Sequence, residues 1–223
     1  MIKKIVAEFI GTFFIIFLGC GTIILNNIRN IGAIAVGLSF GITLMAMIYL
    51  FGKISGSHFN PAVSFTFFVM GQIKILELLL YIISQFFAGI LACFFLVLIF
   101  GKNFIYTKLS VENMISSATD LSPIGIVVII ETILSFIIMF LYTKATNNGK
   151  IKSKIDAFFI GSIFFVSVIF LTNINNIGLN TIRIVVPSLY NFKFEYIFYY
   201  LGANWTGTFL GGISYYFINK LKK

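Results

Sequence analysis

Six long apolar runs take up most of this 223-residue chain and restrict the folds open to it. Hydrophobic residues make up 59% of the sequence and charged residues only 10%, whereas soluble domains carry roughly 25% charged residues. Each run approaches the roughly 20 apolar residues that a helix needs to cross the hydrocarbon core of a bilayer. We therefore predict an all-α membrane protein of a single domain, 1–223, with six transmembrane helices near 5–25, 33–51, 75–100, 124–143, 157–172 and 196–218.

The first run also has one feature of a signal peptide, because Lys3 and Lys4 precede it. It is long for such a segment, contains Glu8, and has no clear cleavage site with small residues before Asn26. We interpret it as a retained first helix.

The net charge of +9 is unevenly distributed along the chain. If the N-terminus is cytoplasmic and the chain crosses six times, eleven of the sixteen Lys and Arg residues fall on the cytoplasmic side. An excess of Lys and Arg on short cytoplasmic loops is the usual bias of membrane proteins. The charge therefore indicates an orientation with both termini cytoplasmic, and not a nucleic-acid partner. The short loops are typical of a bacterial inner membrane protein.

The segment 55–63, Ser-Gly-Ser-His-Phe-Asn-Pro-Ala-Val, interrupts the apolar pattern. Asn60 can accept hydrogen bonds from the first free N–H groups of a helix, and Pro61 has the fixed φ that suits a first helical turn. A helix that begins here is too short to cross the bilayer. The positive end of its dipole would point into the membrane interior, which predicts a re-entrant element beside a pore or a substrate path.

The two halves of the chain resemble each other. Residues 7–18 align with 130–141, Asn60-Pro61-Ala62 with Asn180-Thr181-Ile182, and 81–89 with 199–207. Three crossings per copy would make the second copy enter from the opposite side, as in inverted-repeat membrane proteins. We predict inverted repeats at 1–101 and 123–223, each with a re-entrant half-helix, near 61–70 and 181–190.

Glu8 and Glu131 occupy equivalent positions early in a spanning helix of each copy. Either could be a proton carrier, but a buried carboxylate can also accept hydrogen bonds from loop N–H groups that would have no partner in lipid. We favour this supporting role. The small-residue pairs Gly37/Gly41 and Gly207/Gly211 predict close helix packing.

These residues together resemble the major intrinsic proteins, the family of aquaporins and glycerol facilitators, and most closely the bacterial aquaporin Z type. The resemblance is carried by 7–13, 19–21, 54–63, 81–85 and the Trp205-x-Gly207 pattern. The second motif departs from the family, because Thr181 and Ile182 stand where Pro and Ala are usual. The φ of Thr181 is not locked, and Ile182 adds bulk where the half-helices would touch, so we expect a shifted contact at the midplane.

The resemblance implies a passive channel for water, and for small neutral solutes such as glycerol, that excludes ions and protons. It implies no cofactor, a homotetramer with one pore in each subunit, and His58 as a lining residue on the cytoplasmic side, with gating by His58 as the alternative. Water-strict relatives carry His where this chain has Val168, which predicts a wider and less hydrophilic filter. The pore midplane would consist of Asn60, Pro61, Ala62, Asn180, Thr181 and Ile182, and the selectivity filter of Phe40, Val168, Ile177 and Arg183.

Three other classes of protein fit these residues less well. An enzyme is poorly supported, because the chain has one His, no metal-ligand cluster and no nucleophile–base pair. A secondary transporter is the closer alternative, since inverted repeats with broken helices also form carriers. A purely structural junction protein would leave Arg183 and both asparagines unexplained.

Overall fold

The computed structural model describes residues 1–109, 122–147, 150–172, 174 and 177–221. The regular structure of these residues is helical, apart from a hairpin of two-residue strands, β1 (Thr146–Asn147) and β2 (Lys150–Ile151), in which Thr146 pairs with Ile151. The predicted all-α class is thus confirmed. The helices are α1 (Ile2–Arg29), α2 (Ala33–Phe51), α3 (Pro61–Val69), α4 (Ile75–Phe100), the 3-10 helix η1 (Gly101–Thr107), α5 (Pro123–Ala145), α6 (Lys154–Thr172), α7 (Thr181–Asn191) and α8 (Ile197–Leu221).

Within the described residues, five helical segments are long and apolar enough to cross a membrane: α1, α2, α4 with η1, α5 and α6. The sixth predicted span, α8, has 25 residues but is less apolar, because Gly, Tyr, Asn and Thr recur along it. The outer surface is apolar, with Ile34, Leu98 and Phe198 among the exposed side chains. Polar side chains such as Glu8 and Glu131 are instead buried. This distribution suits a protein that is surrounded by lipid.

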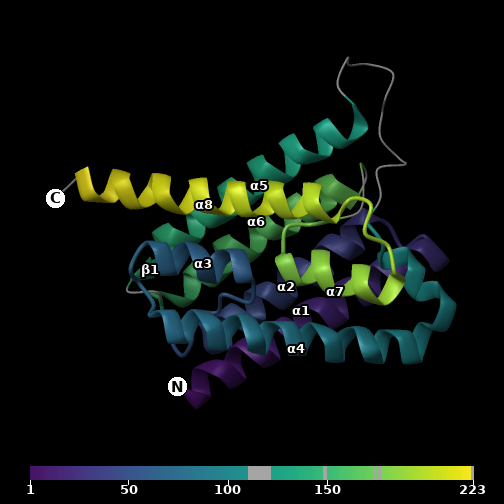
Figure 1. Ribbon diagram of the computed structural model, residues 1–223, viewed down its shortest axis with the longest axis horizontal. Helices are drawn as coiled ribbons and strands as arrows, with labels where there is room; N and C mark the ends of the chain where they lie inside the picture. The colour runs from purple at the N-terminus through teal and green to yellow at the C-terminus, as the bar shows by residue number, and fades with distance from the viewer. Residues whose placement is uncertain (110–121, 148–149, 173, 175–176, 222–223) are drawn as a thin grey trace.

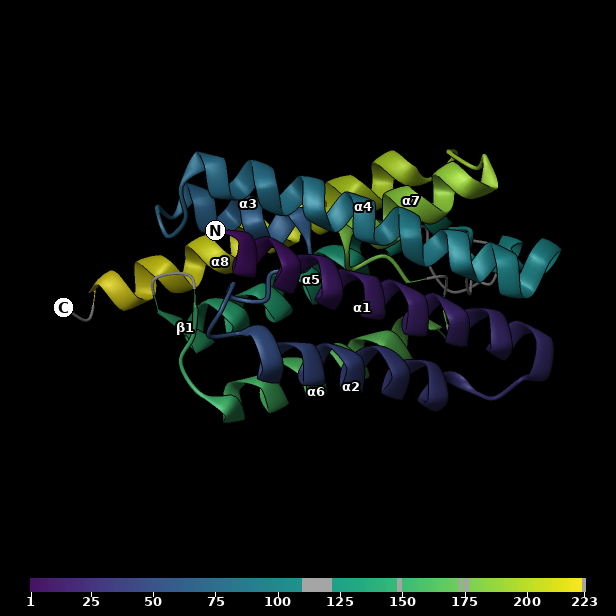
Figure 2. The same ribbon diagram turned by 90° about the horizontal axis from the view of Figure 1, so that it is seen from below.

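The two short helices, α3 and α7, lie end to end between α4 and α8, and their N-terminal ends face each other in the middle of the bundle (Figure 1). Figure 2 shows α1, α2 and α6 on the opposite side of the bundle from α3 and α7. The N-terminal end of α1 and the C-terminal end of α8 lie at the same end of the molecule in both views. The predicted half-helices are therefore present, and each reaches only to the centre.

Glycines at the predicted positions bring the long helices close together. A Cβ added to Gly207 or Gly211 of α8 would collide with backbone carbonyl oxygens of α5, and one added to Gly37 or Gly41 of α2 would collide with α6. Absent side chains at such positions allow membrane helices to approach at backbone distance. The close packing predicted from the glycine spacing is confirmed.

Candidate functional site

An asparagine caps each half-helix at its N-terminus. The Asn60 Oδ1 accepts from the backbone N–H of Ala62 at 3.1 Å, and the Asn180 Oδ1 accepts from Ile182 at 2.8 Å and Arg183 at 3.4 Å. Both asparagines have extended backbone, with φ of −153° and −147°, as N-cap residues do. The two caps therefore form the same local structure, although only α3 has proline at its first position.

Each capping asparagine also bonds to the backbone of the residue that precedes the other one. The Asn60 Nδ2 donates to the carbonyl oxygen of Leu179 at 3.3 Å, and the Asn180 Nδ2 donates to that of Phe59 at 2.8 Å. Phe59 and Leu179 have left-handed backbone, with φ of 49° and 51°, which is uncommon for residues with large side chains. These strained positions turn each carbonyl toward the opposite asparagine. Each amide carries two hydrogens, so one N–H of each asparagine is not used by these contacts.

Thr181, which departs from the family motif, adds a contact that proline could not make. Its backbone N–H donates to the Asn60 Oδ1 at 3.1 Å. Its hydroxyl lies 3.2 Å from the Asn204 Oδ1 and accepts from the Trp205 Nε1 at 3.1 Å. Asn204 continues the chain of contacts by donating to the Ser135 hydroxyl of α5 at 3.1 Å. Hydrogen bonds to α3 and α8 thus take the place of the locked φ of proline.

From its bulk, we expected the side chain of Ile182 to lie in the contact between the half-helices. The structure places it elsewhere. It packs in an apolar cluster with Ile16, Cys20 and Cys93, and its Cγ2 lies where a side chain on Gly89 of α4 would be. The absence of a side chain at Gly89 makes room for the larger residue. The contact between the half-helices consists instead of the asparagine amides and the Thr181 N–H.

Glu8 supports the loop before α3. Its carboxylate accepts from the backbone N–H groups of His58 at 2.9 Å and Phe59 at 2.6 Å, and from the Ser55 hydroxyl at 2.6 Å. Gln85 of α4 donates to the same carboxylate at 2.8 Å. Because the loop lies inside the bundle, these N–H groups would otherwise be buried without a partner.

Glu131 makes the equivalent contacts before α7. Its two carboxylate oxygens accept from the N–H groups of Gly178 at 2.6 Å and Leu179 at 2.8 Å. Glu8 and Glu131 thus accept from the N–H groups at the same two positions of their loops. These are the two residues directly before the capping asparagine. This is the geometry of a supporting carboxylate in both copies.

Two tyrosines, which sequence reasoning did not single out, fix the first loop further. The Tyr81 hydroxyl donates to the carbonyl oxygen of Ser55 at 2.7 Å, and the Tyr142 hydroxyl reaches the carbonyl oxygens of Gly56, at 2.8 Å, and of Ser57. Tyr81 begins the segment 81–85 that carries the family resemblance, but that pattern did not indicate a contact with the loop, and Tyr142 lies in an apolar run without such a signal.

A narrow cavity of about 30 Å³ lies beside the two asparagines. A water molecule takes up roughly 30 Å³ in the liquid, so the cavity has about the volume of one water. His58 lines it, with its Nδ1 3.1 Å from the Ser64 hydroxyl. The lining residues are Ile15, Leu44, His58, Phe59, Asn60, Val63, Ile138, Tyr142, Phe164, Leu179 and Asn180.

The four filter candidates are all nearly fully buried and none of them lines this cavity. Phe40, Val168 and Ile177 belong to one apolar cluster. Arg183 is 1% exposed, and none of its three guanidinium nitrogens has a hydrogen-bond partner among the described residues. An unpaired cation in such surroundings is costly unless polar molecules reach it. The guanidinium group of Arg183 therefore has donors that a polar molecule inside the protein could pair with.

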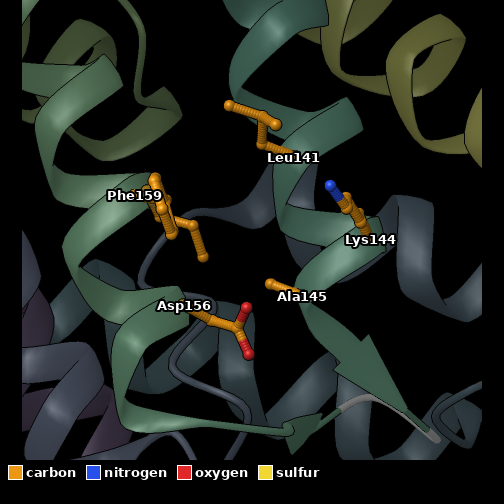
Figure 3. A pocket seen from close by; sticks show the side chains of 6 residues that line it. Leu141, Lys144, Ala145, Asp156 and Phe159 are labelled. Atoms are coloured by element: carbon orange, nitrogen blue, oxygen red, sulfur yellow. The ribbon is translucent and has the colours of Figure 1, made fainter.

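A second cavity, of about 190 Å³, is separate from the asparagines (Figure 3). It lies between α5 and α6 beside the β1–β2 hairpin, and Lys144 and Asp156 point into it from the two helices. It shares no lining residue with the cavity at the asparagines. Among the described residues, no three His, Cys, Asp or Glu side chains lie close enough to hold a metal ion.

A bundle of membrane-length helices, with two half-helices that meet end to end beside a small cavity lined by their capping asparagines, defines a polytopic membrane channel. The chain belongs to the major intrinsic protein family, whose family model matches residues 1–215. It is therefore a multi-pass membrane protein of a family whose members conduct water and small solutes.

Individual relatives agree with this assignment. The chain is 31% identical over 222 residues to a probable aquaporin NIP4-2 of Arabidopsis thaliana, an alignment that covers 97% of this chain and 74% of the relative. It is 44% identical over 95 residues, 41% of each chain, to an aquaporin Z of Photorhabdus laumondii. The solved aquaglyceroporin of Plasmodium falciparum has the same fold, with a TM-score of 0.79 at 18% identity over 99% of this chain and 96% of that chain. The similarity to the aquaporin Z type is thus local, and plant NIP-type aquaporins match over the whole chain.

Proposed function

We propose that this protein is a passive channel for water and small neutral solutes, and that it excludes ions and protons. The observation that carries the proposal is the meeting of two asparagine-capped helix N-termini beside a cavity with about the volume of one water. Asn60 and Asn180 each retain an N–H that can donate to the oxygen of a passing molecule. A water molecule can then exchange one hydrogen bond for another as it advances.

Electrostatics at the midplane oppose positive charge. Each half-helix directs the positive end of its dipole toward the asparagines, which corresponds to roughly half an elementary charge per helix end. This field repels a hydronium ion or a metal cation from both half-helices, whereas a neutral molecule has no net charge to be repelled and can orient its dipole in the field. Half-helix dipoles and an arginine together account for exclusion in aquaporin-type pores.

We assign the selectivity filter to Phe40, Val168, Ile177 and Arg183. The three apolar side chains cannot replace the hydration shell of an ion, so entry would cost the ion at least several kcal/mol of desolvation free energy. The charge on Arg183 adds repulsion of cations, which a low local dielectric strengthens. Val168 is smaller than the His that water-strict relatives carry, and it brings no polar group to the filter. Both differences favour passage of small neutral solutes such as glycerol beside water.

Stopped-flow light scattering on proteoliposomes tests the proposed solutes. We expect fast, non-saturating water efflux under an osmotic gradient, and glycerol reswelling faster than in protein-free vesicles. Water efflux no faster than in protein-free vesicles would reject the channel. Glycerol reswelling at the protein-free rate would reject the wider filter alone, and saturable uptake driven by an ion gradient would favour a carrier.

Orientation and assembly belong to the same proposal. We place both termini on the cytoplasmic side of the cell membrane, with inverted repeats at 1–101 and 123–223 and four copies per assembly. The excess of Lys and Arg on that side supports this orientation, and so does the position of the N-terminal end of α1 and the C-terminal end of α8 at the same end of the bundle. Protease protection of terminal tags in sealed vesicles tests the orientation, and native mass spectrometry tests the assembly.

A further inference from the structure

A cavity of about 400 Å³ lies between α4 and α8 and shares no lining residue with the cavity at the asparagines. Its inner wall contains Pro61 and Thr181, the first residues of α3 and α7, together with Ile182 and Val185. Phe87 of α4 and Trp205 of α8 line its sides. We refer to it as the junction groove, because its lining includes the first residues of both half-helices. Figure 1 shows α3 and α7 between α4 and α8, the helices that supply the rest of its lining.

The junction groove lies near the middle of the membrane, because the two half-helices insert from opposite ends of the bundle and meet there. Water is scarce at this depth, and lipid chain ends are the molecules present. The polar atoms of the lining are already paired: the Trp205 Nε1 donates to the Thr181 hydroxyl at 3.1 Å, and that hydroxyl lies 3.2 Å from the Asn204 Oδ1. The groove therefore presents only carbon to an occupant.

The size and exposure of the groove also fit a lipid chain. Its volume lies within the range of roughly 300–1,000 Å³ that is typical of ligand pockets. Its outer edge is open to the apolar exterior, since Phe87 is 58% exposed and Ile83 is 52% exposed. We propose that the junction groove is a binding site for the hydrocarbon chain of a membrane lipid, which enters between α4 and α8 and ends against Thr181 and Trp205.

A chain in this groove would lie directly behind the pore residues. Thr181 donates its N–H to Asn60, and Trp205 packs against Phe65 of α3 with ring centroids 5.2 Å apart. Trp205 thus contacts both half-helices and the proposed lipid site. The lipid site does not depend on which solutes the pore conducts.

Trp205 is the single tryptophan of the chain, so its fluorescence reports on the groove without labelling. The protein is reconstituted in vesicles of phosphatidylcholine brominated near the headgroup, at mid-chain or near the chain end. We expect bromines near the chain end to quench Trp205 most strongly. Val185→Phe, which fills the groove, is expected to reduce this quenching by about half or more, whereas Val166→Phe on the exposed face of α6 is expected to leave it unchanged.

Several outcomes would overturn the proposal. Strongest quenching by bromines near the headgroup would place Trp205 at the membrane surface. Equal quenching in Val185→Phe and the wild type would show that lipid reaches Trp205 by another route. No quenching at any depth would show that protein, such as a second copy of the chain, covers the groove. If Val185→Phe does not fold, Ile83→Phe, which fills the groove from the α4 side, replaces it in the same quenching test.

Discussion

Asn60 and Asn180 are joined by a reciprocal pair of hydrogen bonds. Each donates its side-chain amide to the carbonyl oxygen of the residue that precedes the other asparagine, at 3.3 Å to Leu179 and 2.8 Å to Phe59. Each asparagine also accepts from the first turn of its own half-helix. The same two side chains therefore cap the half-helices and hold them together, and both line the cavity.

Substitutions of Asn60 can separate these roles. Asn60→Ala removes both the cap and the contact with Leu179, and we expect a loss of about 1–3 kcal/mol in unfolding free energy together with a large loss of water permeability. Asn60→Ser keeps a hydroxyl that can cap the helix but has no amide to reach Leu179. We expect it to retain most of the stability but not the permeability. Thermal unfolding in detergent and stopped-flow efflux measure the two effects, and equal stability of the two variants would contradict the assigned cap.

Thr181→Pro restores the residue usual in the family and is nevertheless expected to destabilise this chain. It removes the N–H that donates to Asn60 and the hydroxyl that contacts Asn204 and Trp205. Unpaired buried polar groups cost about 1–3 kcal/mol each. Thr181→Ser keeps both groups and is expected to unfold within a few degrees of the wild type. If the proline variant proved as stable as the wild type, the Thr181 contacts would have no energetic role.

Glu131→Gln is expected to weaken the loop before α7. The amide retains one oxygen, so either the Gly178 N–H or the Leu179 N–H loses its acceptor, at a cost of about 1–3 kcal/mol. Glu195→Gln, at an exposed position, is the matched control and is expected to change stability by less than about 0.5 kcal/mol. Hydrogen–deuterium exchange of the loop amides checks the location of the effect. Unchanged exchange at Leu179 would argue against a supporting role.

Two glycines of α8 offer a matched pair. A Cβ on Gly207 would collide with the carbonyl oxygen of Thr132, whereas a Cβ on Gly202 would meet no atom within 4 Å. We expect Gly207→Ala to cost about 1–3 kcal/mol through overpacking and Gly202→Ala to gain about 0.5–1 kcal/mol through helix propensity. Unfolding temperatures measured in one detergent compare the stability of the two variants. Equal stability of Gly207→Ala and Gly202→Ala would mean that α5 can move away from α8 at no cost.

Arg183→Val tests the exclusion of charge. The substitution removes the buried cation, so we expect water permeability to stay at or above the wild-type level while proton and cation leak rises roughly tenfold, which corresponds to about 1.4 kcal/mol of barrier. A pH-sensitive dye inside the vesicles records the leak during the same osmotic experiment. Arg29→Val, at the exposed end of α1, controls for the loss of a positive charge. A leak that does not change would assign exclusion to the midplane alone.

Much of the fold could be predicted from the sequence. The predicted helix 75–100 matches α4 at both ends, and the half-helices begin where the asparagine caps indicate. The first helix extends further than predicted, from Ile2 to Arg29, because α-helical hydrogen bonding continues past the apolar residues into polar ones at both ends. The hairpin of β1 and β2 was not predicted, since two-residue strands leave no periodic pattern.

The site was less predictable where it depends on residues distant in the sequence. The Ile182 side chain lies against α4 because Gly89 has no side chain there. The contacts of the Thr181 hydroxyl depend on Asn204 and Trp205, which lie on another helix. Local propensity contains no information about these neighbours. The capping asparagines and the paired glutamates could be predicted because their roles follow from the backbone groups that any buried loop must satisfy.

The contact between Asn60 and Leu179 spans 119 positions of the chain. At typical synthesis rates of 5–20 residues per second, roughly six to twenty-four seconds pass between the emergence of the two residues from the ribosome. During that interval the Asn60 amide has no Leu179 carbonyl to donate to, so the first half of the protein is made before this contact can form. Pairing of the two half-helices is therefore a late step in the biogenesis of this protein.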